Sequence, residues 1–332
     1  MSFHLRFGPG DLLRCRFALS PRWETQEAVR VLARPGRHGY HRPWLRRIRD
    51  AAAGLDLRPL WLLMPRRGHS PDFLWPPPGA PAAGFEEEMA AVRRTDPEVA
   101  REDLRRSLAC TPGALDSPTG RAMLADPARA VQELADLSEA AWRALVEPEW
   151  PRLRALLEAD VLFHSRLLAA GGLAALFDGL HPDLRWDGAN DTLTVRRDSH
   201  HERRLDGRGL VLLPSAFVWP DLVGGFDAPW QPTVVYPARG IGALWAEDGG
   251  PTPAALAGLL GRARADVLHA LGEPASTTAL ARRLGLAPSS VSAHLKALHA
   301  AGLLTRHRHG HQVHYARTSL GTALATGSAP VS

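Results

Sequence analysis

Apolar residues between positions 275 and 298 recur at the spacing of two short helices. Leu280 and Leu284 lie four residues apart, which places both on one face of the first helix. The apolar face of the second helix consists of Val291, Leu295 and Leu298. Its opposite face is small, polar or cationic and lacks carboxylates; it carries Ser289, Ser290, Ser292, Ala293, His294 and Lys296. Such a face can lie in a major groove, because hydroxyls and imidazole can bond to base edges while a carboxylate would repel phosphate.

The residues around these helices predict where each one begins and ends. Thr277 or Thr278 can cap the first helix, and Gly285 can end it in the left-handed conformation that glycine adopts at low cost. Pro288 suits the first turn of the second helix, and either of the two serines that follow it can supply a capping oxygen. We therefore expect a helix, a tight turn and a second helix over residues 288–301.

A β-hairpin is expected directly after the second helix. Its strands are Leu303–His307 and Gln312–Ala316, joined by a turn around Gly310. Cationic and titratable side chains gather at the tip: Arg306, His307, Arg308, His309 and His311. Together with His314, the hairpin histidines also allow a zinc or copper site, since a spacing of two places His307 and His309 on one strand face. We favour contacts between this tip and DNA, with cations reaching into the minor groove.

This helix, turn, helix and basic hairpin resemble the winged helix-turn-helix of the arsenic-repressor (ArsR/SmtB-like) transcription regulators. The matching residues are 280–285, 289–298, 301–304 and His314-Tyr315-Ala316. The resemblance implies that helix 288–301 lies in the major groove and that hairpin 303–316 is the wing. The residues expected to contact double-stranded DNA are Ser289, Ser290, Ser292, Ala293, His294, Lys296, Arg306, His307, Arg308, His309 and Tyr315. We expect a transcription regulator that binds DNA as a homodimer.

The charge distribution supports nucleic acid as the partner. The whole chain has a net charge of +5, yet the segment from Pro251 to Ser332 alone holds eight Lys and Arg against two acids. The excess positive charge therefore lies entirely in the C-terminal segment, which is the electrostatic footprint of a DNA-binding domain.

The same resemblance requires metal sensing to be considered. ArsR-like metal sensors carry Cys-x-Cys on the helix before the recognition helix, or His and Asp ligands on a C-terminal helix. Here the helix before the recognition helix reads Thr278-Ala279-Leu280-Ala281 and contains no cysteine, and the C-terminal tail 318–324 offers no metal ligands. We therefore expect no metal site and no cofactor.

The remainder of the chain reads as a helical body followed by a small β region. The predicted helices are Pro21–Arg34, Trp44–Met64 with a break at Gly54, Phe85–Cys110, Ala128–Val146 and Trp150–Ala170. The predicted short strands are 3–7, 184–186, 192–195, 210–213, 216–219, 233–236 and 241–245. The fold class is therefore α+β: a body over 1–246 that mixes helices with a small, mostly antiparallel β region, a Gly/Pro-rich linker over 247–253, and a winged helix-turn-helix domain over 254–320. The first helix of that domain is expected over Ala254–Leu271.

The N-terminal body offers little that indicates its chemistry. Ser20-Pro21 with Trp23 and Glu24 resembles the opening of larger actinobacterial-type regulators, in which an uncharacterised domain precedes an ArsR-like one. No nucleophile elbow, phosphate-binding loop, zinc-protease or dinucleotide motif is present, so we expect no enzyme. His200-His201-Glu202 is the densest titratable cluster, and we interpret it as a solvated loop.

Two roles remain open for the body: oligomerisation, or the binding of a small-molecule effector. Aromatics on short loops could line an apolar ligand pocket, but packing in a small core is the interpretation we favour; they are Trp186, Phe217, Trp219, Phe226, Trp230, Tyr236 and Trp245. The alternative function is an enzyme or ligand-binding protein whose winged helix mediates protein–protein contacts. No signal segment is recognised and no apolar run is expected to span a membrane, so we expect a cytoplasmic protein without a membrane partner.

Overall fold

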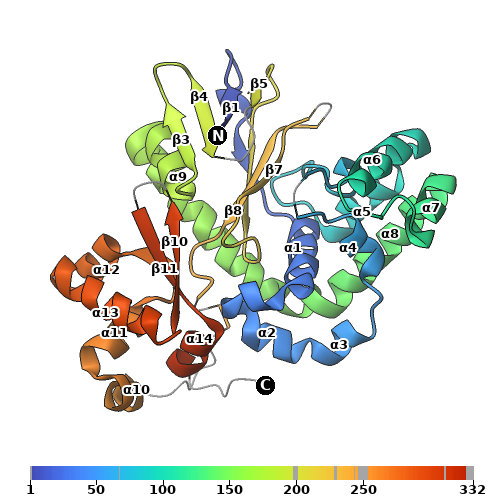
Figure 1. The fold of residues 1–332 in the computed structure, drawn as a ribbon. Helices are drawn as coiled ribbons and strands as arrows, with labels where there is room; N and C mark the ends of the chain where they lie inside the picture. The colour runs from blue at the N-terminus through green and yellow to red at the C-terminus, as the bar shows by residue number, and fades with distance from the viewer. Residues whose placement is uncertain are drawn as a thin grey trace. The chain divides into compact units, whose positions relative to one another are not determined.

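The computed structural model describes residues 2–66, 68–196, 201–227, 230–242, 244–245, 253–309 and 312–326 (Figure 1). The chain divides into two compact units. The first comprises Met1–Ala33 and Ile48–Ala238, and the second comprises Arg34–Arg47 and Arg239–Ser332. Both units combine helices with small sheets, so the expected α+β class is confirmed.

The α-helices of the first unit are α1 Pro21–Ala33, α3 Arg49–Ala53, α4 Arg58–Leu62, α5 Phe85–Arg93, α6 Pro97–Ala109, α7 Pro118–Ala125, α8 Pro127–Ala141 and α9 Trp150–Leu180. Short helical turns are η1 Leu12–Arg14, η4 Asp72–Leu74, η6 Glu147–Glu149 and a π-helical turn, η5 Trp142–Val146. Three helices begin alike, because the side chains of Asp96, Ser117 and Asp126 cap backbone N–H groups and a proline follows each one. The predicted single helix Phe85–Cys110 is therefore wrong, since Asp96 starts a new helix there.

Helix α9 is long and apolar. The helical stretch Pro127–Leu180 contains an 18-residue window of mean hydropathy 1.3, so by length and composition alone one apolar run does approach a membrane span, contrary to expectation. Gly172 interrupts the helix with φ 67° and ψ −160°. In a bilayer, the backbone groups at such a break would have no hydrogen-bond partners, because lipid supplies none. Leu176 and Phe177 after the break pack into a core cluster of the first unit. The break and this packing are features of a helix in a folded unit, although only 22% of the apolar window is buried.

The first unit contains two four-stranded sheets. One has the order β3-β4-β1-β5 and the other β2-β6-β8-β7. The strands are β1 Ser2–Arg6, β2 Arg16–Phe17, β3 Leu184–Asp187, β4 Thr192–Arg196, β5 His201–Arg204, β6 Val211–Ser215, β7 Val223–Gly225 and β8 Thr233–Pro237. The pairs β1–β5, β2–β6 and β6–β8 are parallel, and β1–β4, β3–β4 and β7–β8 are antiparallel. The expected mostly antiparallel region is wrong, because β1 and β2 arrive from the N-terminus and pair in parallel with β5 and β6, and because β6 and β8 also run parallel.

Three local expectations are also corrected. Residues 216–219 and the described residues of 241–245 form turns rather than strands. Residues 201–204 form β5 rather than a solvated loop, because they pair with β1, and Glu202 forms an ion pair with Arg6. His200 lies outside the described residues.

The second unit holds the helix-turn-helix segment. Its helices are α2 Arg42–Arg47, α10 Pro253–Leu260, α11 Arg262–Ala270, α12 Thr277–Leu284, α13 Pro288–Ala300 and α14 Ser319–Thr326, with short turns η2 Pro35–Arg37 and η3 Gly39–His41. Its sheet has the order β10-β11-β9, with strands β9 Ala275–Ser276, β10 Leu304–His309 and β11 Gln312–Arg317. The predicted helix Ala254–Leu271 is divided, because Gly261 adopts φ 81° between α10 and α11. The buried core joins α11, α12, α13 and the hairpin through Val267, Leu268, Leu280, Val291, Leu295, Leu298 and Leu303.

A segment from the N-terminal part of the chain belongs to this second unit. The Tyr40 hydroxyl donates to Leu271 O at 3.5 Å and accepts from Arg317 N at 3.4 Å. Trp44 is fully buried and stacks on Trp245 at 6.3 Å between ring centroids. The sequence pattern gave no sign of this insertion. The predicted linker lies outside the described residues except for Pro253, so the predicted domain limits stay a prediction.

Candidate nucleic-acid interface

Helix α12 and the turn after it follow the predicted pattern, with one correction. Gly285 ends α12 in the left-handed conformation at φ 65°, as predicted. The N-cap is Ser276 rather than Thr277 or Thr278, and its Oγ accepts from Ala279 N at 3.3 Å. The cap lies one residue earlier than predicted because Ser276 is the last residue of β9, where extended backbone gives an N-cap its geometry.

Helix α13 presents the predicted buried and exposed faces. Val291, Leu295 and Leu298 are at most 2% exposed. On the other side, Ser289, Ser290, Ala293 and Lys296 are exposed, and Ser292 and His294 are half-buried. Pro288 occupies the first turn, but no side chain caps the helix, so the expected capping role of Ser289 or Ser290 is wrong. Both hydroxyls are consequently not engaged in capping.

The hairpin that follows α13 is also present. Strands β10 and β11 pair in antiparallel register from Leu304 opposite Arg317 to His309 opposite Gln312. Arg306 is exposed on β10. The side chains of His307, Arg308 and His309, and all of Gly310 and His311, lie outside the described residues. The DNA contacts expected of this tip, and the metal site considered as its alternative, therefore stay predictions.

Two residues of the hairpin have structural roles that the sequence did not indicate. Tyr315 is 8% exposed and packs in the core of the second unit, so the expected phosphate contact is not supported by its position. Arg317 is 6% exposed; its Nε donates to Leu268 O at 2.8 Å and its Nη2 to His269 O at 2.5 Å. Burial lowers the pKa of Arg317. Arg317 is one of the eight Lys and Arg residues of the C-terminal segment, and its side chain stabilises the fold by linking β11 to the end of α11 through these hydrogen bonds.

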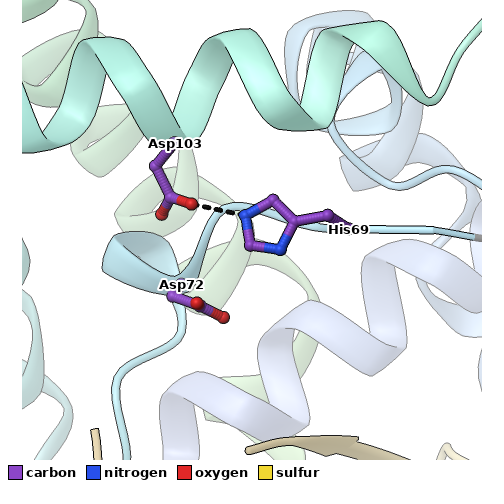
Figure 2. A group of neighbouring side chains, drawn as sticks. All are labelled: His69, Asp72 and Asp103. Atoms are coloured by element: carbon purple, nitrogen blue, oxygen red, sulfur yellow. Dashed lines mark hydrogen bonds and ion pairs between the residues drawn. The ribbon is translucent and has the colours of Figure 1, made fainter. Parts of the chain in front are cut away.

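The structure brings together one cluster of titratable residues that sequence reasoning missed. His69, Asp72 and Asp103 lie close together in the first unit (Figure 2). Burial, and next the neighbouring Asp103, raise the pKa of Asp72 to about 6. His69 and Asp72 share a His-x-x-Asp spacing, but Asp103 lies on a different helix. No local motif could have predicted the three-residue set.

The aromatic residues considered as a ligand pocket are divided between several environments. Trp186, Phe226 and Tyr236 pack against or within a core cluster of the first unit, and Phe217 is 1% exposed. Trp245 belongs to the second unit. Phe226 and Trp230 also line a cavity of about 670 Å³ in the first unit, together with His69 and Asp72. Core packing thus accounts for most of the set, while two of its members lie in the cavity wall.

Comparison with known protein families agrees with this geometry. Residues 259–307, which include α11, α12, α13 and part of β10, match a family described as a helix-turn-helix domain. Residues 85–242 match a family of unknown function (DUF5937). No curated protein and no solved structure matches the chain. The chain therefore carries a C-terminal helix-turn-helix domain, preceded by a segment that matches a family of unknown function.

Proposed function

We propose that this protein is a sequence-specific transcription regulator that binds duplex DNA in the cytoplasm as a homodimer. In this proposal α13 lies in the major groove, the β10–β11 hairpin acts as the wing, and the first unit binds an effector or mediates oligomerisation. The contacts to bases come from Ser289, Ser292, Ala293 and His294, and those to phosphates from Lys296, Arg306 and Arg308. No enzymatic activity is required of either unit.

The outer face of α13 carries this proposal. It is exposed at Ser289, Ala293 and Lys296, and every residue from Pro288 to Ala300 lacks a carboxylate. A surface against phosphate has a physical reason to exclude acids, and so does a surface against an acidic protein; the salt-dependent binding of duplex described below separates the two. The exposed Arg282 and Arg283 on the neighbouring α12 add further positive charge.

A homodimer follows from the reach of one recognition helix. Helix α13 has 13 residues, and a helix of this size reads only a few base pairs within one major groove. Two copies on half-sites about one helical turn apart would double the contacts and match a palindromic operator.

The alternative, an enzyme or ligand-binding protein whose winged helix contacts another protein, makes a different prediction in one experiment. The purified full chain would be incubated with fragmented genomic DNA, and the retained fragments would be tested for affinity at several salt concentrations. A DNA-binding regulator should retain a shared sequence, and the logarithm of its affinity should fall linearly with the logarithm of salt concentration. Retention of no fragment, or an affinity for duplex that does not change with salt, would favour the alternative.

A further inference from the structure

The His69 cluster draws its residues from three separate places in the first unit. His69 lies in the loop before η4, Asp72 is the first residue of η4, and Asp103 lies on α6. Their ligand atoms, one imidazole nitrogen and two carboxylate oxygens, all lie within 4.8 Å of one another. Figure 2 shows the three side chains converging from the loop, the turn and the helix.

Neighbouring groups hold two of these side chains in place. His69 Nε2 contacts Asp103 Oδ1, and the other oxygen of Asp103 accepts from Phe73 N at 3.0 Å. The backbone N–H of His69 donates to Cys110 Sγ at 3.3 Å. The hydrogen bond from Phe73 N to Asp103 is of the kind that orients a carboxylate ligand in metal sites. The contact between His69 Nε2 and Asp103 Oδ1 joins two of the three side chains directly, and a cation bound between them would take its place.

Asp72 differs from its two neighbours. Its carboxylate has no hydrogen bond or ion pair with any residue in the described part of the chain. Burial disfavours its charged form most strongly, and the repulsion from Asp103 exceeds the attraction from His69. The side chains of His69 and Asp103 are only 16% and 9% exposed. Two carboxylates held close together in such a partly desolvated place repel each other, and a cation between them would remove the repulsion.

A cavity of about 670 Å³ gives access to this cluster. His69 and Asp72 line it, together with aromatic side chains that include Trp23, Trp75 and Phe226. Apart from Arg30, whose Nε lies 3.4 Å from Glu27 Oε2 in an ion pair, two of its lining residues carry a buried polar atom without a hydrogen-bond partner in the described structure, Trp23 Nε1 and Gln26 Oε1. Buried polar groups are normally paired, so these atoms are a second, independent sign that a ligand belongs in this region.

We propose that His69, Asp72 and Asp103 bind one divalent first-row transition-metal cation, whose remaining coordination positions are open to the cavity. One imidazole nitrogen and two carboxylate oxygens are the mixed donor set that suits Zn²⁺ and Mn²⁺, and three protein ligands with an open position are typical of metal sites that also bind a small molecule. The site lies in the first unit, so its existence does not depend on DNA binding. We further expect that metal bound at this site changes the affinity of the protein for DNA, and only this expectation rests on the proposed function.

The test is calorimetric titration of the tag-free full chain, after removal of metals by a chelator, with Zn²⁺ and separately with Mn²⁺. The histidines of the hairpin could bind zinc themselves. All titrations therefore use a background in which His307→Gln, His309→Gln and His311→Gln are combined. We expect about one equivalent of Zn²⁺ to bind, and Mn²⁺ to bind more weakly, as the general order of divalent affinities predicts.

Single substitutions in this background identify the ligands. Asp72→Asn and His69→Gln should each weaken Zn²⁺ binding by about 100-fold or more, since loss of groups that merely orient the ligands already costs 10- to 100-fold. Asp227→Asn is the matched control: Asp227 lines the same cavity but pairs with Arg203 and Arg106, so zinc affinity should stay within about 3-fold.

Two results would overturn the metal site. One is the absence of a bound equivalent of either metal in the background protein; the other is zinc affinity unchanged in both Asp72→Asn and His69→Gln. Thermal unfolding of each variant without metal shows that it is folded, and added Zn²⁺ should raise the unfolding temperature of the background protein but not that of Asp72→Asn. Binding of zinc without any change in DNA affinity would leave the site in place and remove only its regulatory role.

Discussion

Truncation of Trp44 should destabilise the DNA-binding unit, although this residue lies about 240 positions before α13 in the sequence. Trp44 is 0% exposed, stacks on Trp245, and lies edge-on to His41 at 6.2 Å between ring centroids. Trp245 Nε1 donates to His41 Nδ1 at 2.9 Å, which connects the three residues. A buried tryptophan removes roughly 150–250 Å² from water, which at about 25 cal/mol per Å² corresponds to roughly 4–6 kcal/mol.

Trp44→Ala should therefore lower the free energy of unfolding of the second unit by about 3–5 kcal/mol, the range observed for truncation of large buried aromatics. Hydrogen–deuterium exchange with mass spectrometry measures this locally, because peptides from α11 and α13 should exchange faster in the variant. The control is Trp142→Ala, which removes a buried tryptophan, stacked on Phe85 at 4.7 Å, from the first unit. Unchanged protection of α11 and α13 in Trp44→Ala would refute the assignment of residues 34–47 to the second unit.

Three other outcomes follow from the same structure. Lys296→Ala should reduce the slope of the logarithm of affinity against the logarithm of salt by roughly one unit without changing the preferred sequence, as expected for loss of one phosphate contact; a changed preference would assign Lys296 to bases. Arg308→Ala should reduce the same slope by a similar amount if the hairpin is a wing, and a slope equal to that of the wild type would show that Arg308 does not contact DNA. Burial raises the pKa of Glu24 to about 8, so protonation of its carboxyl stabilises the folded state, and the free energy of unfolding should fall by up to a few kcal/mol as pH rises from about 5 to about 8. Glu24→Gln should remove this part of the pH dependence, because the amide does not titrate, while its oxygen can still accept the hydrogen bond that Ala216 N donates to Glu24 at 3.0 Å. If the free energy of unfolding depended on pH in the same way in Glu24→Gln, other groups would be responsible for that dependence.

The helix-turn-helix could be predicted from the sequence because its determinants are local. The spacing of Val291, Leu295 and Leu298 fixes the buried face of α13, and Gly285 and Pro288 mark the turn. The N-cap of α12 was misplaced because the extended backbone of β9, which pairs with β11, makes Ser276 the capping residue. That pairing is a tertiary contact which no local pattern contains.

The features that could not be predicted all depend on distant contacts. The parallel pairing of β1 with β5 joins strands about 200 residues apart, and a period-two pattern does not distinguish parallel from antiparallel neighbours. Arg317 looked like another surface cation, because its burial depends on carbonyls at the end of α11. The His69 cluster has the same origin, since Asp103 reaches it only when α6 packs beside the loop.

The central claim is that the outer face of α13 lies against DNA, and one substitution tests it most directly. Ala293 is exposed on the side of α13 opposite the buried leucines, so Ala293→Glu adds a carboxylate to this face without disturbing the core. Ala128→Glu, at an exposed position in the first turn of α8, is the matched control with the same change in charge. With the duplex selected by the wild-type protein, Ala293→Glu should lower affinity by about 100-fold or more, because a carboxylate would meet phosphates and base edges, while Ala128→Glu should bind as wild type does. Equal affinities of the two variants, with both proteins folded, would contradict the account.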